Sequence, residues 1–237
     1  MRKCISNAVV CILSLIFCAK LYAAEKILLT TQIWPPYQVY HDNILDGPAV
    51  TVVKNILEKM EVPYEINVYP WERAQFMVKV GAAQGFFLAS KNNKRDAYAT
   101  FSEVIFPQKW NWYLLRGNPL NPTDESFKDK ACILVRFGSN MQYWLQANHY
   151  KAVGSFKNTD ALVKALLAKR CDAILANELA INNYLEEHGL SSDIFEIYPN
   201  MDKPLGVYWS NQYLTENPDF LEKFNYFVRK YRPTDEY

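Results

Sequence analysis

The sequence lacks the short motifs that most often mark catalysis. It has no G-x-S-x-G elbow, no G-x-x-x-x-G-K-S/T loop, no G-x-G-x-x-G turn and no H-E-x-x-H helix. Its histidines, His41, His149 and His188, are few and far apart, whereas metal sites need clustered ligands. We therefore expect no metal, no cofactor and no enzymatic activity.

The chain also lacks an excess of charge of either sign. Its 26 basic and 25 acidic residues give a formal net charge of +1, which provides no electrostatic footprint for nucleic acid. Half of the 237 residues are apolar and no low-complexity stretch occurs, which excludes a disordered chain, a collagen and a small disulfide scaffold. The length suits one large domain or two small ones.

The N-terminus has the layout of a secretory signal peptide. Arg2 and Lys3 precede an apolar run from 8 to 18, and small residues follow at Ala23 and Ala24. The run is too short for a comfortable membrane span, although an uncleaved membrane anchor is the alternative. We predict a signal peptide over residues 1–23 and a periplasmic mature protein.

Cleavage after Ala23 removes Cys4, Cys11 and Cys18 and leaves Cys132 and Cys171. These two are not in C-x-x-C spacing, so neither a zinc ribbon nor a redox pair is indicated. Because exported proteins mature in an oxidising compartment, the pair predicts one disulfide bond, with two buried free thiols as the alternative.

Apolar segments of strand length alternate with helical patterns along the mature chain. Uninterrupted apolar strands separated by helices indicate parallel sheets covered on both faces. The pattern restarts after a linker at 117–124, which divides the chain into two α/β units of ordinary domain size. We expect strands at 26–31, 64–69, 85–89, 110–115, 131–136, 151–156, 172–176, 194–198 and 205–209, with the last helix at 217–231.

Several motifs resemble one known family. The first unit carries Trp34-Pro35-Pro36-Tyr37, then the run from Pro70 to Ala74, then the segment from Ser90 to Arg95 and Phe101-Ser102. The second unit matches more loosely, at Gly138-Ser139-Asn140 and at Asn177-Glu178 after a strand. In this order the motifs resemble the extracellular solute-binding proteins of the polar amino acid type (bacterial solute-binding protein family 3), which are periplasmic partners of ABC importers.

The resemblance implies a fold, a domain division and partners. The expected fold is α/β, a two-lobed type 2 periplasmic-binding-protein fold in which each lobe has a mostly parallel sheet flanked by helices. Two hinge strands, near 114–119 and 198–205, join the lobes. Lobe 1 would comprise 24–116 plus 204–237, and lobe 2 would comprise 117–203. The expected partners of this monomer are a small polar ligand and either an ABC permease or a membrane receptor.

The ligand would lie in the cleft between the lobes. A carboxylate entering a dry site needs a fixed cation, and the planar fork of arginine suits it. Arg95 follows a buried strand, where α/β sheets bind ligands, and Ser90 adds a hydroxyl. The resemblance makes Trp34 a stacking aromatic. The other expected contacts are Tyr37, Trp71, Arg73, Ser139, Asn140, Asn177 and Glu178.

One departure from the family bears on ligand identity. Members that hold an α-amino group commonly have an aspartate where this chain has Asn177, and an amide brings no compensating charge. A carboxylate ligand without an amine, or an amine held by Glu178, would both fit.

Three functions remain open from the sequence. The first is a binding protein for ABC import of a small, amino-acid-like carboxylate. The second is a dehydratase-like enzyme on the same fold, for which Glu178 is the obvious acid or base. The third is a free ligand-sensing subunit for a membrane receptor.

Overall fold

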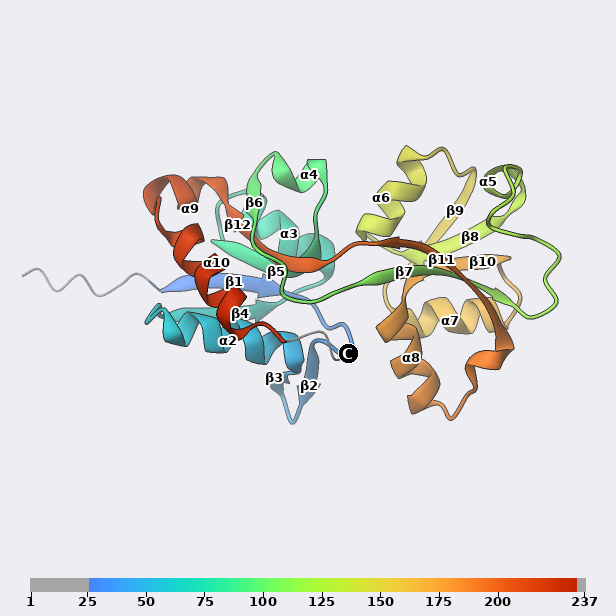
Figure 1. The fold of residues 1–237 in the computed structure, drawn as a ribbon, viewed down its shortest axis with the longest axis horizontal. Coiled ribbons are helices and arrows are strands. Elements are labelled where there is room, and N and C mark those ends of the chain that lie inside the picture. The colour runs from blue at the N-terminus through green and yellow to red at the C-terminus, as the bar shows by residue number, and fades with distance from the viewer. Residues whose placement is uncertain (1–25, 234–237) are drawn as a thin grey trace, which may run out of the picture.

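The computed structural model describes residues 26–233, which form two lobes lying side by side (Figure 1). The predicted signal peptide, residues 1–23 with Cys4, Cys11 and Cys18, lies outside the described residues. Within 26–233, none of the helices has the length and apolar character needed to cross a membrane.

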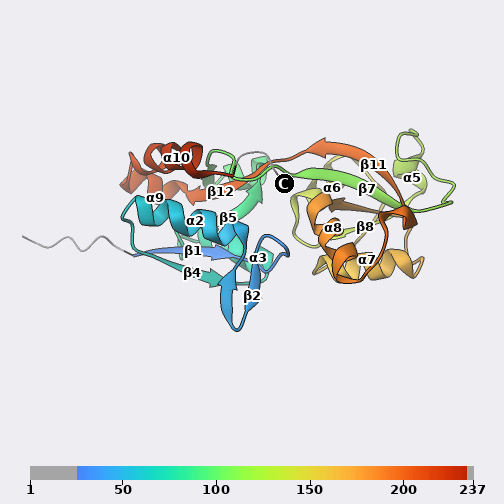
Figure 2. The same cartoon turned by 60° about the horizontal axis from the view of Figure 1, so that its bottom comes forward.

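The first lobe is built on a five-stranded sheet in the order β4-β1-β5-β12-β6. β5 is buried along its whole length, because the run GFFLAS is covered on both faces. The strands are β1 (Ile27–Thr31), β4 (Tyr64–Val68), β5 (Gly85–Ser90), β6 (Ala99–Phe101) and β12 (Leu205–Ser210). The helices are α2 (Pro48–Lys59), α3 (Trp71–Lys79), α4 (Asn93–Asp96), α9 (Asn211–Glu216) and α10 (Phe220–Tyr231). A hairpin of β2 (Val39–His41) and β3 (Ile44–Asp46) projects from this lobe (Figure 2).

The second lobe is built on a five-stranded sheet in the order β11-β7-β10-β8-β9. Helices α5 and α6 pack on one face of this sheet, and α7 and α8 pack on the other. The strands are β7 (Lys109–Leu115), β8 (Cys132–Arg136), β9 (Ala152–Phe156), β10 (Ala173–Asn177) and β11 (Phe195–Asp202). The helices are α5 (Phe127–Lys130), α6 (Asn140–Ala147), α7 (Thr159–Leu167), α8 (Glu178–Glu187) and the short η1 (Ser192–Ile194).

The position of β7 differs from the sequence-based expectation. We expected this segment to end the first lobe, but it pairs antiparallel with β10 and β11 in the second sheet. The first crossing between lobes therefore comes before Lys109 rather than after residue 116. β12 returns to the first sheet antiparallel to β5 and β6. Each sheet is thus mixed, where we expected mostly parallel pairing.

The two crossings lie next to each other and are hydrogen-bonded. The amide of Lys203 donates to the carbonyl of Gln108 at 2.8 Å, and Leu205 and Phe106 exchange backbone bonds of 2.8 and 3.2 Å.

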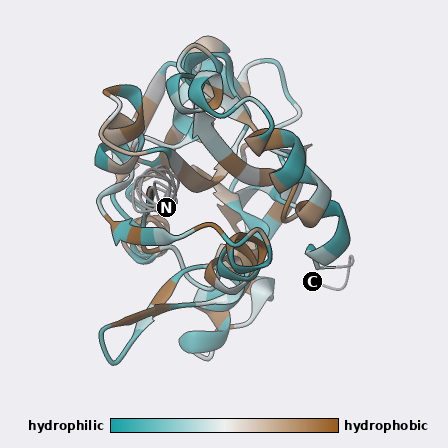
Figure 3. Ribbon diagram, turned by 90° about the vertical axis from the view of Figure 1, so that its left-hand side faces the viewer, coloured by the Kyte–Doolittle hydropathy of each residue, from teal (hydrophilic) through white to brown (hydrophobic). Residues whose placement is uncertain are grey.

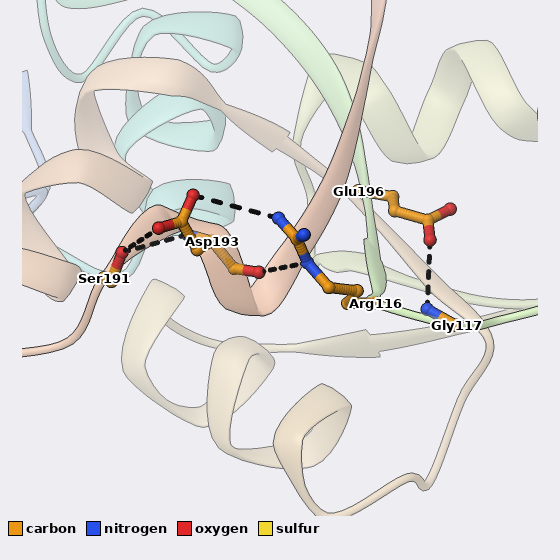
Figure 4. A network of polar contacts seen from close by, with 5 residues as sticks. All are labelled: Arg116, Gly117, Ser191, Asp193 and Glu196. Carbon is orange, nitrogen blue, oxygen red and sulfur yellow. Dashed lines mark hydrogen bonds and ion pairs between the residues drawn. The ribbon is translucent and has the colours of Figure 1, made fainter.

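β7 and β11 then run together to the far end of the second lobe. There Arg116 Nε donates to the Asp193 carbonyl at 2.6 Å and the Gly117 amide donates to Glu196 Oε1 at 3.0 Å (Figure 4). The segment 114–119, expected as a hinge, is therefore anchored within the second lobe.

The predicted disulfide is not formed, because Cys132 and Cys171 are both free. Cys132 is the first residue of β8, and Cys171 lies two residues before the first residue of β10. The register of these strands pairs Ile133 with Ala173, which sets Cys132 opposite Asp172 and leaves Cys171 one residue out of step. The Asp172 carboxylate accepts a bond of 2.8 Å from the Cys132 amide, and the Asp172 amide donates to the Cys132 carbonyl at 2.9 Å.

Apolar side chains hold each lobe together on both faces of its sheet. Along the helices, hydrophobic and hydrophilic segments alternate, as expected of helices with one face on a core (Figure 3). In the first lobe, α10 packs Phe224 edge-on against Trp209 of β12, with ring centroids 5.0 Å apart. Both rings are fully buried, so the last helix covers the strand that returns from the second lobe.

This packing predicts the cost of truncating Phe224. We expect Phe224→Ala to lower the free energy of unfolding by about 3–5 kcal/mol, because it leaves a cavity in a closely packed core. Urea unfolding measures the change. Phe76→Ala is the matched control: its ring is 57% exposed, and such a surface change shifts stability by about 0.5 kcal/mol or less. Equal losses in the two variants would contradict this account of α10.

Candidate functional site

A small cavity of about 40 Å³ lies between the lobes. The first lobe contributes residues after β1, from α3 and from the carboxyl end of β5, while the second contributes residues from the ends of β8 and β10 and from α6. Carboxyl ends of strands from both sheets thus meet at one place, as is usual for ligand sites in α/β folds.

The structure brings most of the predicted contacts together around this cavity. A set of aromatic, hydroxyl, amide and guanidinium side chains lines it: Trp34, Trp71, Ser90, Arg95, Ser139, Asn140 and Asn177. Whether each of them contacts a ligand remains a prediction.

Three predicted residues lie elsewhere. Tyr37 is buried behind the cavity, where its hydroxyl accepts a 3.2 Å bond from Asn177 Nδ2. Arg73 is exposed, with its guanidinium 4.9 Å from the ring centroid of Tyr69. Glu178 is 43% exposed and lies 4.0 Å from Lys109 Nζ. Arg73 and Glu178 lie on helices, as expected, but the helical pattern did not say which side of each helix faces the cavity.

The side chain of Arg95 is buried and is held in place by hydrogen bonds. Its side chain is 3% exposed, with Nε donating to Gln75 Oε1 at 2.9 Å and Nη1 donating to the Ser90 carbonyl at 2.6 Å. The guanidinium also lies 5.4 Å from the ring centroid of Trp71. The Asn92 side chain, which caps α4, accepts a 3.0 Å bond from the Arg95 amide and so fixes the backbone from which the guanidinium extends.

Burial governs the charge on Arg95. Desolvation lowers the pKa of its guanidinium to about 10, and the nearby groups of Tyr208, Tyr98 and Asp96 offset this only in part. Asp96 is itself bonded to the Tyr208 hydroxyl at 2.7 Å. Among the described residues, no carboxylate lies within 4.0 Å of Arg95. The group remains a cation at neutral pH and has only neutral hydrogen-bond acceptors.

The sequence-based prediction missed five polar or aromatic residues of the cavity: Gln32, Gln108, Trp110, Arg136 and Thr159. Gln32 directly follows β1, and Arg136 is the last residue of β8. Their places at carboxyl ends of strands could have identified both. Gln108 and Trp110 lie at the first crossing, which we had expected further along the chain.

The lobes contact each other directly around the cavity. Asn140 Nδ2 donates to Ser90 Oγ at 2.9 Å and to the Lys91 carbonyl at 3.0 Å, and Asn140 Oδ1 accepts from Asn92 Nδ2 at 3.0 Å. Gly138, with a φ of +67°, approaches the first lobe so closely that a Cβ would lie 2.5 Å from Glu72 Cγ. The structure is therefore a closed arrangement of the two lobes.

The chemistry of the cavity wall favours binding. It contains neither acidic side chains nor histidine or cysteine, and no group of three or more potential metal ligands occurs in residues 26–233. Four buried polar atoms of lining residues have no hydrogen-bond partner. Three are donors, Trp34 Nε1, Trp110 Nε1 and Arg136 Nε, and one is an acceptor, Gln108 Oε1. The wall thus offers mainly donors and positive charge.

Two α/β lobes, a double crossing and a cavity between them define a type 2 periplasmic-binding-protein fold, which confirms the fold class predicted from the sequence. No family model matches the sequence, and no curated protein matches it. The comparison therefore rests on solved structures.

Three solved structures illustrate the likeness. Holo ArgBP from T. maritima is 15% identical over 89% of this chain and 92% of that chain, with a TM-score of 0.71. ArtJ from Geobacillus stearothermophilus, an arginine-, lysine-, histidine-binding protein, is 14% identical over 87% and 89%, with a TM-score of 0.72. A histidine kinase sensor domain with similarity to periplasmic binding proteins is 16% identical over 87% and 90%, with a TM-score of 0.74.

The contacts of Asn140 predict its role in closure. Asn140→Ala removes three hydrogen bonds between the lobes. At about 0.5–1.5 kcal/mol each, we expect the equilibrium to shift toward an open form by about 10–2,000-fold. Small-angle X-ray scattering measures the increase in radius of gyration.

Asn148→Ala is the matched control for this experiment. Asn148 ends the same helix, and its side chain bonds only to the carbonyl of Trp144 within the second lobe. Identical scattering curves for Asn140→Ala and the unmodified protein would contradict the role of Asn140.

Proposed function

We propose that this chain is a periplasmic solute-binding protein that captures a small carboxylate-bearing ligand between its lobes and delivers it for ABC import. The fold, the cavity between the lobes and the names of the solved relatives support the proposal. These relatives include an amino acid ABC transporter's binding protein, at 17% identity and a TM-score of 0.68.

The single observation that carries the proposal is the buried charge of Arg95. A buried cation with only neutral partners is costly, and a ligand carboxylate would supply both the missing charge and paired hydrogen bonds. Ser90 borders the same space. The aromatic rings of Trp34 and Trp71 would supply apolar contact area, and the polar groups would orient the ligand.

Binding without turnover is the better supported activity. General acid–base catalysis needs a titratable group within hydrogen-bond reach of the reacting atoms. Glu178, the residue expected for an enzyme, lies outside the cavity wall beside Lys109. Incubation of the pure protein with its ligand should therefore yield no product.

A second function, ligand sensing for a membrane receptor, is favoured by one comparison, the histidine kinase sensor domain. The two functions differ in what they need downstream. Import requires a permease that the closed protein docks on, and loss of that permease should abolish uptake of the ligand. If the protein serves sensing instead, its own loss should leave uptake of the ligand intact and abolish a transcriptional response to that ligand.

The proposed location predicts the N-terminus of the mature protein. Export with cleavage after Ala23 should yield a periplasmic chain that begins at or near Ala24. Intact-mass analysis of the periplasmic fraction measures this. A full-length chain that retains Met1 would contradict export by a cleaved signal peptide.

The proposed anchor predicts the effect of Arg95→Ala. Mass spectrometry of material co-purified from the periplasm identifies the ligand, and calorimetry then measures its affinity. We expect Arg95→Ala to weaken binding by about 2–5 kcal/mol, because a buried carboxylate would be left without its cation. Arg73→Ala, which removes an exposed arginine of the same lobe, should bind as the unmodified protein does. Unchanged affinity in a folded Arg95→Ala protein would exclude Arg95 as the anchor.

A further inference from the structure

A second guanidinium, that of Arg136, reaches the cavity from the other lobe. Arg136 ends β8, and its side chain extends across the interface to the first lobe. There Nη2 donates to Gln32 Oε1, and Cζ lies 5.0 Å from the ring centroid of Trp34. Each arginine of the cavity is thus stacked on its own tryptophan, Arg95 on Trp71 and Arg136 on Trp34.

The charge of Arg136 has no acidic partner. In the described part of the chain, no carboxylate lies within 4.0 Å of it, and its one hydrogen-bond acceptor is a neutral amide. Its Nε is buried and unpartnered. Burial lowers the pKa of the guanidinium to about 10, so it is still charged at neutral pH.

Two positive charges therefore face one cavity whose wall contains no acidic side chain. A zwitterion with a neutral side chain brings only one carboxylate for the two guanidinium groups, and its ammonium group adds a further positive charge. A ligand with two anionic groups would balance them, and it would accept hydrogen bonds from the unpartnered donors of Trp34, Trp110 and Arg136.

The cavity wall also has no negatively charged side chain that could pair with an amino group of a ligand. Asn177 Oδ1 caps α8 by accepting a 2.7 Å bond from the Ala180 amide, and its Nδ2 donates to Tyr37. Glu178, the alternative amine ligand, lies outside the cavity wall. Burying an ammonium group without a carboxylate is costly.

We propose that the ligand is a small organic dianion without an amino group, of the dicarboxylate class. Arg95 holds one anionic group, Arg136 holds the other, and the tryptophans contact the hydrocarbon segment between them. This inference rests on the proposed function, because it specifies the ligand of the same cavity. It separates the chain from its solved relatives that are named for binding arginine, lysine and histidine.

Calorimetry with matched probes tests the inference. Malonate, succinate, glutarate and adipate vary the spacing between two carboxylates. L-Glutamate is glutarate with an α-amino group added, and butanoate is a monoanion of similar size. We expect at least one dicarboxylate to bind about tenfold or more tightly than both L-glutamate and butanoate, because each of these lacks one favourable charge interaction or adds an unpaired one.

Variants of Arg136 test whether this residue binds the second anionic group of the ligand. Arg136→Gln should weaken the best dicarboxylate about tenfold or more while changing butanoate binding little, so the preference for the dianion is lost. Arg136→Lys, which keeps the charge, should keep part of that preference. Thermal melts of both variants verify that they fold.

Gln32→Ala separates this role from a purely mechanical one. If Arg136 only held the lobes together through its hydrogen bond to Gln32, then Arg136→Gln and Gln32→Ala would each weaken binding of the dianion and of the monoanion by the same factor. We expect equal weakening of dianion and monoanion binding for Gln32→Ala, but not for Arg136→Gln. Finding it for Arg136→Gln overturns the inference.

The outcomes also separate the two proposals. Binding of L-amino acids as tight as, or tighter than, that of every dicarboxylate overturns the dianion inference and leaves the solute-binding function standing. Failure of every dicarboxylate, of butanoate and of a full panel of amino acids to bind overturns both.

Discussion

Two buried guanidinium groups whose hydrogen bonds go only to neutral oxygens are the constraint on which the site depends. Arg95 is held by Gln75 and the Ser90 carbonyl, and Arg136 is held by Gln32, so neutral oxygens carry all of their hydrogen bonds. Like charges repel, and the repulsion grows in a desolvated space. Because the two arginines come from different lobes, closing the lobes brings the charges into one cavity. An anion between them would turn this cost into attraction, which couples binding to closure.

The amide side chains at the interface serve the protein rather than the cavity. Asn140 connects α6 to the end of β5 and the loop after it, and Asn177 joins the cap of α8 to Tyr37. Since these donors and acceptors are engaged in hydrogen bonds within the protein, the guanidinium and indole groups are the ones left with unpartnered donors toward the cavity. This division explains why an asparagine at the position of the family's usual aspartate does not by itself create an amine site.

The sequence predicted the elements well and their assembly less well. Buried apolar strands and helical spacing are local properties, so β5, α10 and the Ser90–Arg95 segment were found where expected. Which sheet β7 joins, and the one-residue register that separates Cys132 from Cys171, depend on long-range pairing that no local pattern encodes. Arg136 differs from these cases: its place at the end of a predicted strand was visible in the sequence, whereas its partners Gln32 and Trp34, about a hundred residues earlier in the chain, were not.

The paired crossings have a consequence for how the molecule moves. The chain passes between lobes twice, and the two passages are bonded to each other at Phe106, Gln108, Lys203 and Leu205. Such a ribbon bends across its strands without breaking these bonds, whereas sliding one strand past the other would break them. Motion of the lobes is thereby reduced to one principal rotation axis. A single distance between the lobes consequently reports the conformational state of the whole molecule.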